Sequence, residues 1–111
     1  MSGKRWGLLV LAALLAGCGE EEEDRVASVL ALEGDAAAGE TLYGTECAGC
    51  HGASGEGGVG PAMDSLVPAL SPEAFVEVTI YGFGESMPAH EYLTDQEVAD
   101  IYTWLSENFG G

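Results

Sequence analysis

Basic side chains are almost missing from this chain of 111 residues, which has 3 lysine and arginine residues against 19 aspartate and glutamate residues. Proteins that bind nucleic acid set lysine and arginine against phosphates, so nucleic acid is not an expected partner. Such acidity suits either docking to a basic protein or plain solubility in a salty medium. Net charge alone does not separate the two.

Long apolar runs are missing as well. The run at residues 6–16 is shorter than the roughly 20 residues that cross a bilayer. Two basic residues precede it and small residues follow it, a pattern typical of an export signal at residues 1–17. Its end, Leu15 to Cys18, looks like a bacterial lipobox, which implies cleavage before Cys18 and lipid on its sulfur. The alternative is an incidental thiol near an ordinary cleavage site.

The segment after the predicted signal is strongly acidic. Loss of the signal would leave Arg25 as the one positive side chain against 19 negative ones, a formal charge of −18. Residues 19–25 carry like charges and no apolar face, which predicts a solvated tether. The short apolar stretch 26–32 is either an extended arm or a short helix. We therefore predict a lipidated cysteine and acidic tether at 18–33, and a folded domain at 34–111.

Strand signals and internal repeats are absent, and three helices are predicted in that domain. Asp35 can cap the first, over residues 36–47, and Ser71 with Pro72 starts the second, which ends near Gly82. The third follows a Thr94/Glu97 capping box and carries an apolar stripe at helical spacing, Val98, Ile101, Tyr102 and Leu105. Glycine-rich loops join the helices. So small a domain buries little apolar area, and a bound cofactor can supply the missing stability.

The sequence Cys47-Ala-Gly-Cys50-His51 matches the attachment pattern for c-type haem. At this spacing both sulfurs can reach neighbouring vinyl groups and form thioethers, while His51 can bind the iron. A thioredoxin-like motif would sit near a βαβ pattern, and none is visible. A zinc site would need a fourth ligand such as His90. A Cys47–Cys50 disulfide would close too small a loop to stabilise much.

The chain resembles the class I cytochromes c over about residues 34–109. The match rests on residues 39–52 for the first helix and haem site, and on Ile101, Trp104 and Leu105 for the last helix. The resemblance implies a small all-α fold wrapped around one covalently bound haem c, with the first and last helices crossing at Gly39. It also implies that the Pro61 carbonyl holds the imidazole of His51, and that Met87 is the distal ligand.

The residues themselves leave three candidates for the second iron ligand. Met87 stands in a loop far enough along the chain to reach the other haem face, and Pro88 restricts it to extended conformations. Met63 is expected to pack over the haem within a loop, and His90 to lie at the surface. Methionine ligation raises the reduction potential of haem and closes the iron to substrates.

These features predict a one-electron carrier in a respiratory or photosynthetic chain, anchored by lipid to the outer or periplasmic face of a bacterial membrane. A redox-protein donor and acceptor, with basic docking surfaces, are the expected partners. No catalytic residue is required, so an enzyme is not expected. The alternatives are a haem peroxidase or gas or redox sensor with a displaceable sixth ligand, and a haem-free anchored module with a disulfide.

Overall fold

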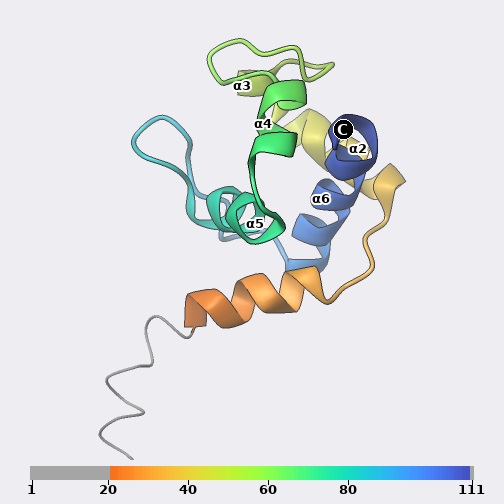
Figure 1. The fold of residues 1–111 in the computed structure, drawn as a ribbon, viewed down its shortest axis with the longest axis vertical. Helices are drawn as coiled ribbons and strands as arrows, with labels where there is room; N and C mark the ends of the chain where they lie inside the picture. The colour runs from red at the N-terminus through yellow and green to blue at the C-terminus, as the bar shows by residue number, and fades with distance from the viewer. Residues whose placement is uncertain (1–20, 111) are drawn as a thin grey trace, which may run out of the picture.

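The computed structural model describes residues 21–110, and the regular elements in that range are helices (Figure 1). Residues 21–30 form the first helix, followed by α2 (Ala36–Glu46), α3 (Ala48–His51), α4 (Met63–Ala69), α5 (Pro72–Tyr81) and α6 (Asp95–Phe109). Within the same range, β pairing is limited to an isolated bridge between Phe83 and Met87. The predicted all-α fold is confirmed.

The three predicted helices begin where their capping residues stand. Asp35 accepts hydrogen bonds from the N–H groups of the first turn of α2, and Ser71 accepts one from the third residue of α5 at 3.1 Å. Thr94 and Glu97 form the complete capping box of α6, with bonds of 3.1 and 2.9 Å. Each bond satisfies an N–H group that has no partner within its own helix, which fixes the helix start.

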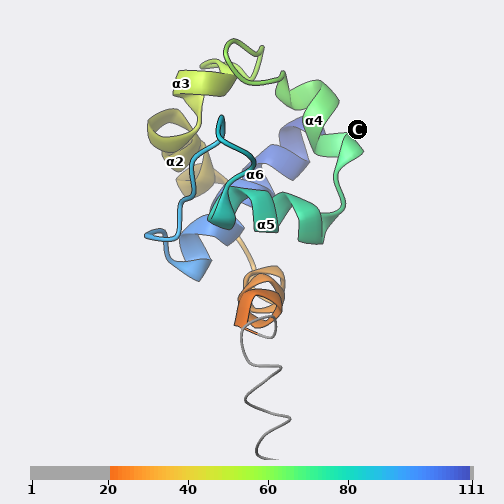
Figure 2. The ribbon, with the colours of Figure 1, turned by 90° about the vertical axis from the view of Figure 1, so that its left-hand side faces the viewer.

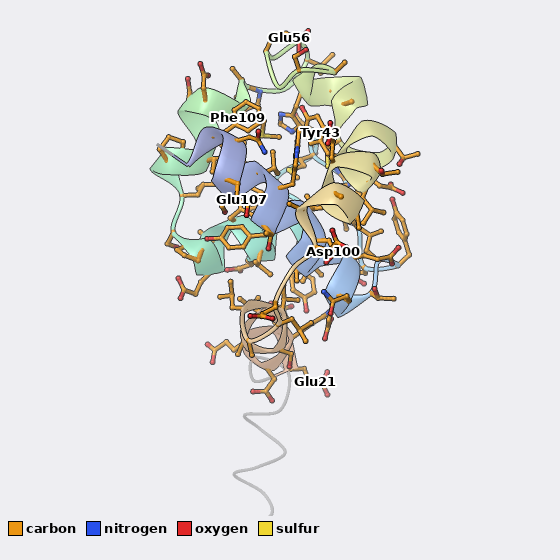
Figure 3. The ribbon with its side chains drawn as sticks, turned by 90° about the vertical axis from the view of Figure 1, so that its right-hand side faces the viewer. Glu21, Tyr43, Glu56, Asp100, Glu107 and Phe109 are labelled. Atoms are coloured by element: carbon orange, nitrogen blue, oxygen red, sulfur yellow. The ribbon has the colours of Figure 1, made fainter. Side chains whose placement is uncertain are left out.

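Helices α2 and α6 pack against each other and form the frame of the domain. A side chain at Gly39 would overlap the backbone carbonyl of Asp100, so glycine is required where the two backbones cross. Tyr43 projects from α2 toward α6, where its ring lies 5.0 Å from that of Trp104 (Figure 3). Asp100 is buried on α6 and accepts the N–H of Asp35 at 2.8 Å, which ties the start of α2 to the last helix.

Helix α4 was not predicted: a loop was expected from Gly52 to Pro61, and Met63 was expected to lie in a loop as well. It is short and contains Pro68, so neither a period nor a propensity marks it in the sequence. Its Met63 and Val67 are buried in the core cluster. A helix of this length depends on such packing for its stability rather than on its own sequence.

Residues 21–25, which belong to the predicted acidic tether, are helical and continuous with the helix up to residue 30. This helix lies at the end of the domain opposite α3 (Figures 1 and 2). Val26 and Val29 are buried, so the open choice for residues 26–32 is decided largely in favour of a docked helix. The predicted signal and Cys18 lie outside the described residues. No helix within residues 21–110 has the length and apolar character needed to cross a membrane.

Candidate functional site

An apolar cavity of about 360 Å³ is lined by residues of the short helix α3 and of the loop at residues 82–93, among others. Its volume lies within the range of small-molecule and cofactor sites. Every residue that the sequence suggested for haem binding lines it, namely Cys47, Cys50, His51, Pro61, Met63, Met87 and His90. The other lining residues are mostly apolar; Leu66 of α4, Phe75 and Val78 of α5, and Ile101 and Leu105 of α6 are among them, and the rest come mainly from loops.

The two cysteines and His51 are presented by a tight turn at the end of α2. The Cys47 N–H donates to the carbonyl of Tyr43 at 2.9 Å, and the His51 N–H donates to the carbonyl of Cys47 at 3.1 Å. The following loop folds back over this turn: Gly57 donates to the His51 carbonyl at 2.7 Å and Gly60 to the Cys50 carbonyl at 2.8 Å. The glycine-rich loop therefore holds the backbone of the motif in place.

The imidazole of His51 is fixed in both orientation and tautomer. It is buried, and its Nδ1 lies 2.8 Å from the Pro61 carbonyl. A carbonyl oxygen only accepts, so Nδ1 carries the proton and Nε2 keeps its lone pair for a metal. Gly60 lies against the ring: a Cβ there would be 2.8 Å from Cε1 of His51. A larger residue would push the imidazole out of place.

Cys47 and Cys50 do not form a disulfide with each other. Burial raises the pKa of the Cys47 thiol to about 11, and the negative charges of Glu46 and Cys50 act in the same direction. A thiol that stays protonated at neutral pH is a poor nucleophile for disulfide exchange. This environment disfavours a thioredoxin-like role and suits a sulfur that forms a stable thioether.

The other wall of the cavity is formed by the loop that carries Met87. Phe83 and Met87 exchange backbone hydrogen bonds of 3.1 and 3.2 Å, which close the tip of the loop. Gly82, with φ of +80°, begins the loop in a conformation that favours glycine, and a Cβ there would lie 2.7 Å from the Met87 carbonyl oxygen. Met87 is thus presented on a constrained hairpin opposite the Cys47–His51 turn.

His90 was expected at the surface, and this expectation is wrong. It is 6% exposed, and its Nδ1 lies 2.9 Å from the carbonyl of Thr79 in α5. It therefore helps to fix the loop against α5. Met63 is also buried on the cavity wall, but as the first residue of α4 rather than in a loop.

A zinc site receives no support. Within residues 21–110, no three histidine, cysteine, aspartate or glutamate side chains lie close enough together to hold a metal ion. The cavity instead fits a flat apolar group that is held at one edge by two thiols and faced by an imidazole and a thioether. The donor set present thus fits haem c.

Sequence reasoning missed a link between the two walls of the cavity. The hydroxyl of Tyr92, in the loop after Met87, donates a hydrogen bond to the Glu46 carboxylate at the end of α2. These residues are 46 positions apart, and neither belongs to a motif, so no sequence signal marks the pair. The spacing of the glycines did mark the close approach at Gly60.

A small helical domain built around an apolar cavity with this cysteine and histidine turn defines a c-type cytochrome. The family described as "Cytochrome C oxidase, cbb3-type, subunit III" matches residues 34–105. The chain therefore belongs to the class I c-type cytochromes: it carries covalently bound haem c and transfers electrons. The resemblance noted from the sequence is confirmed.

Relatives and solved structures agree with this assignment. Cytochrome c-551 of Bacillus subtilis is 36% identical over 99 residues, which cover 87% of each chain. The cytochrome c-553-like protein of Synechocystis sp. is 34% identical over 80 residues, which cover 72% of this chain and 75% of that one. The crystal structure of cytochrome cL from Methylophaga aminisulfidivorans has a TM-score of 0.58 and 32% identity, over 64% of this chain and 51% of that one.

Proposed function

We propose that this cytochrome is a one-electron carrier whose haem is held by thioethers to Cys47 and Cys50 and whose iron is bound by His51 and Met87. The observation that carries the proposal is the pairing of the oriented His51 imidazole with the Met87 hairpin on opposite walls of one cavity. When bound, haem supplies an iron that cycles between Fe(II) and Fe(III).

The chain's own residues tune that chemistry. The bond from His51 to the Pro61 carbonyl orients the imidazole and increases its basicity as a ligand. The soft, neutral thioether of Met87 favours Fe(II) and raises the reduction potential. The apolar lining excludes water, and with both His51 and Met87 bound to the iron no position would remain for a substrate. The proposed role is therefore electron transfer without catalysis.

The mouth of the cavity is the expected docking surface for donor and acceptor proteins. Val59 and Phe83 line the cavity yet are 88% and 72% exposed, so they form an apolar rim that a partner can cover. Arg25 is the only basic side chain other than histidine within residues 21–110, so a partner with basic residues around its own site is electrically complementary. If docking depends on the negative charge of this chain, electron transfer should slow as the salt concentration rises. Rates that do not change with salt would mean that the acidic residues serve solubility instead.

Lipid on Cys18 is the proposed anchor, on the outer or periplasmic face of a bacterial membrane. Replacement of Cys18 by serine should release the cytochrome into soluble fractions with its haem attached. A variant that stays with membranes as firmly as the wild type would mean that another feature holds it there.

The closed iron is tested by adding carbon monoxide to the reduced, haem-loaded protein and following the visible spectrum. An electron carrier with two strong protein ligands binds it slowly or not at all. Rapid, complete binding would mean an open or easily opened iron and would put a peroxidase or a gas sensor ahead of an electron carrier. A pyridine haemochrome spectrum of the same sample checks for thioether-linked haem.

A further inference from the structure

The one lysine or arginine within residues 21–110 is Arg25, on the helix at residues 21–30. That helix is a fixed part of the domain, because Val26 and Val29 are only 8% and 1% exposed and belong to the core cluster. It lies beneath α5 and the start of α6, away from α3 (Figure 1). Arg25 is therefore held in one place relative to the rest of the fold.

The guanidinium of Arg25 contacts three residues that lie 66 to 70 positions further along the chain. Its Nε donates to the Asp95 carboxylate at 2.9 Å, and Nη1 donates to the Glu91 carbonyl at 3.2 Å. Its Nη2 donates to the Leu93 carbonyl. The side chain of Arg25 is 23% exposed, so these bonds are partly shielded from water. Arginine suits this position because its planar fork offers five donors in fixed directions.

The carbonyls that Arg25 binds lie on the segment that follows Met87. In that segment the His90 N–H donates to the Ile80 carbonyl at 2.8 Å, and the Leu93 N–H donates to the His90 carbonyl at 3.1 Å. The base of the Met87 hairpin is thus fixed to α5 on one side and to the N-terminal helix on the other. Of the two residues whose carbonyls bind Arg25, Glu91 is the nearer to Met87 in sequence, four residues after it.

We propose that Arg25 is a positioning residue for the distal loop, residues 82–93, and that through it the N-terminal helix keeps Met87 against the cavity. The inference rests on the proposed role of Met87 as the second iron ligand. Displacement of Met87 requires the hairpin to move away from the iron. That movement is easier when the Glu91 and Leu93 carbonyls no longer accept hydrogen bonds from Arg25.

Imidazole binding to the oxidised holoprotein measures how readily Met87 is displaced, because imidazole competes for the same position and abolishes the weak near-infrared band of sulfur bound to ferric iron. Arg25→Gln removes both the guanidinium group and its positive charge, while Arg25→Lys keeps the positive charge but not the planar set of N–H donors. Ala27→Glu, at an exposed position of the same helix, is the control, since it changes the net charge by the same amount. We expect Arg25→Gln to bind imidazole about tenfold more tightly than the wild type, Arg25→Lys to be intermediate, and the control to match the wild type.

Hydrogen exchange provides a readout that does not depend on the iron. In Arg25→Gln, the amide protons of His90 and Leu93 should exchange about tenfold faster than in the wild type, while those of Gly57 and Gly60, on the opposite wall, should be unchanged. A merely structural role for Arg25 would not produce this local pattern.

The proposal is overturned if Arg25→Gln lowers the denaturant midpoint but leaves both imidazole affinity and exchange at His90 and Leu93 at wild-type values. If the wild type itself lacks the sulfur band, the proposed role of Met87 fails instead. Exchange at His90 and Leu93 still decides in that case whether Arg25 positions the loop.

Discussion

The two walls of the haem cavity are built in different ways. The wall with Cys47, Cys50 and His51 is contiguous: the loop that holds it ends at Pro61, and the bond that orients His51 spans 10 residues. The wall with Met87 is assembled from distant parts of the chain. Its segment is bound by α5, by Glu46 across 46 positions and by Arg25 across 66.

This difference suggests that one wall serves to attach the haem and the other to tune the properties of its iron. A contiguous segment can form and hold its side chains with little help from the rest of the fold, which suits a wall that must receive the haem. A wall that depends on remote contacts transmits any change in those contacts to Met87. We therefore expect substitutions near Cys47–Pro61 to affect cofactor and stability, and those near Met87 to affect the iron's sixth position.

Replacement of both Cys47 and Cys50 by alanine should have the largest effect. The haem can then no longer be attached, and a domain this small with an apolar cavity of about 360 Å³ lacks the core to fold without it. We expect largely unfolded apoprotein by far-ultraviolet circular dichroism. A cooperative, haem-free fold would show that the walls form without the cofactor.

The wall that carries Met87 can be disturbed selectively by a substitution at Gly82. Alanine there adopts a backbone conformation open almost only to glycine and brings its Cβ to 2.7 Å from the Met87 carbonyl, at a cost of about 3 kcal/mol. The haem should stay attached while the near-infrared sulfur band weakens. Gly84→Ala is the matched control, because Gly84 also has a positive φ but a Cβ there meets no atom within 4 Å. Equal effects of the two substitutions would contradict the role given to Gly82.

Gly60 is the corresponding position on the wall that carries Cys47, Cys50 and His51. Alanine there would press on the His51 ring and weaken its bond to the Pro61 carbonyl, for a loss of about 1–3 kcal/mol in denaturant unfolding. The near-infrared sulfur band, which reports on Met87, should persist. Gly49→Ala, where a Cβ meets no atom within 4 Å, should be neutral or slightly stabilising. Loss of the sulfur band in Gly60→Ala would mean that the two walls are not independent.

The bond between Tyr92 and Glu46 joins the walls, and its loss should have the smallest effect. The pKa of Tyr92 is raised above its usual value because the protonated hydroxyl donates to the Glu46 carboxylate. Its contribution to stability is therefore complete below about pH 10, the usual tyrosine value, and is lost as the pH rises through the raised pKa. Denaturant midpoints measured from pH 8 to pH 11 should fall slightly more in the wild type than in Tyr92→Phe, with Tyr102→Phe as control. Parallel curves would mean that the bond contributes nothing.

The contiguous wall is also the one that the sequence predicts well. Cys47, Cys50 and His51 form a motif whose chemistry requires them to lie close together in the sequence, and the resemblance to the class I cytochromes c implied the contact between His51 and the Pro61 carbonyl. Capping residues likewise predicted the starts of α2, α5 and α6, since a cap acts within three residues.

Remote contacts account for the errors. His90 was expected at the surface because nothing near it in sequence shows the Thr79 carbonyl that binds its ring. Residues 19–25 were expected to be a solvated tether, and residues 26–32 were left open between an extended arm and a short helix, because nothing near them in sequence shows the contacts that Arg25, Val26 and Val29 make with the domain. Helix α4 depends in the same way on burial of Met63 and Val67.

The central claim is that Met87 closes the iron, and the near-infrared spectrum of oxidised Met87→Ala beside oxidised Met63→Ala tests it most directly. Both methionines line the cavity, so the pair separates ligation from packing. We predict that the sulfur band of the wild type disappears in Met87→Ala, with a lower reduction potential, and persists in Met63→Ala. Loss of the band in Met63→Ala together with its survival in Met87→Ala would contradict the account.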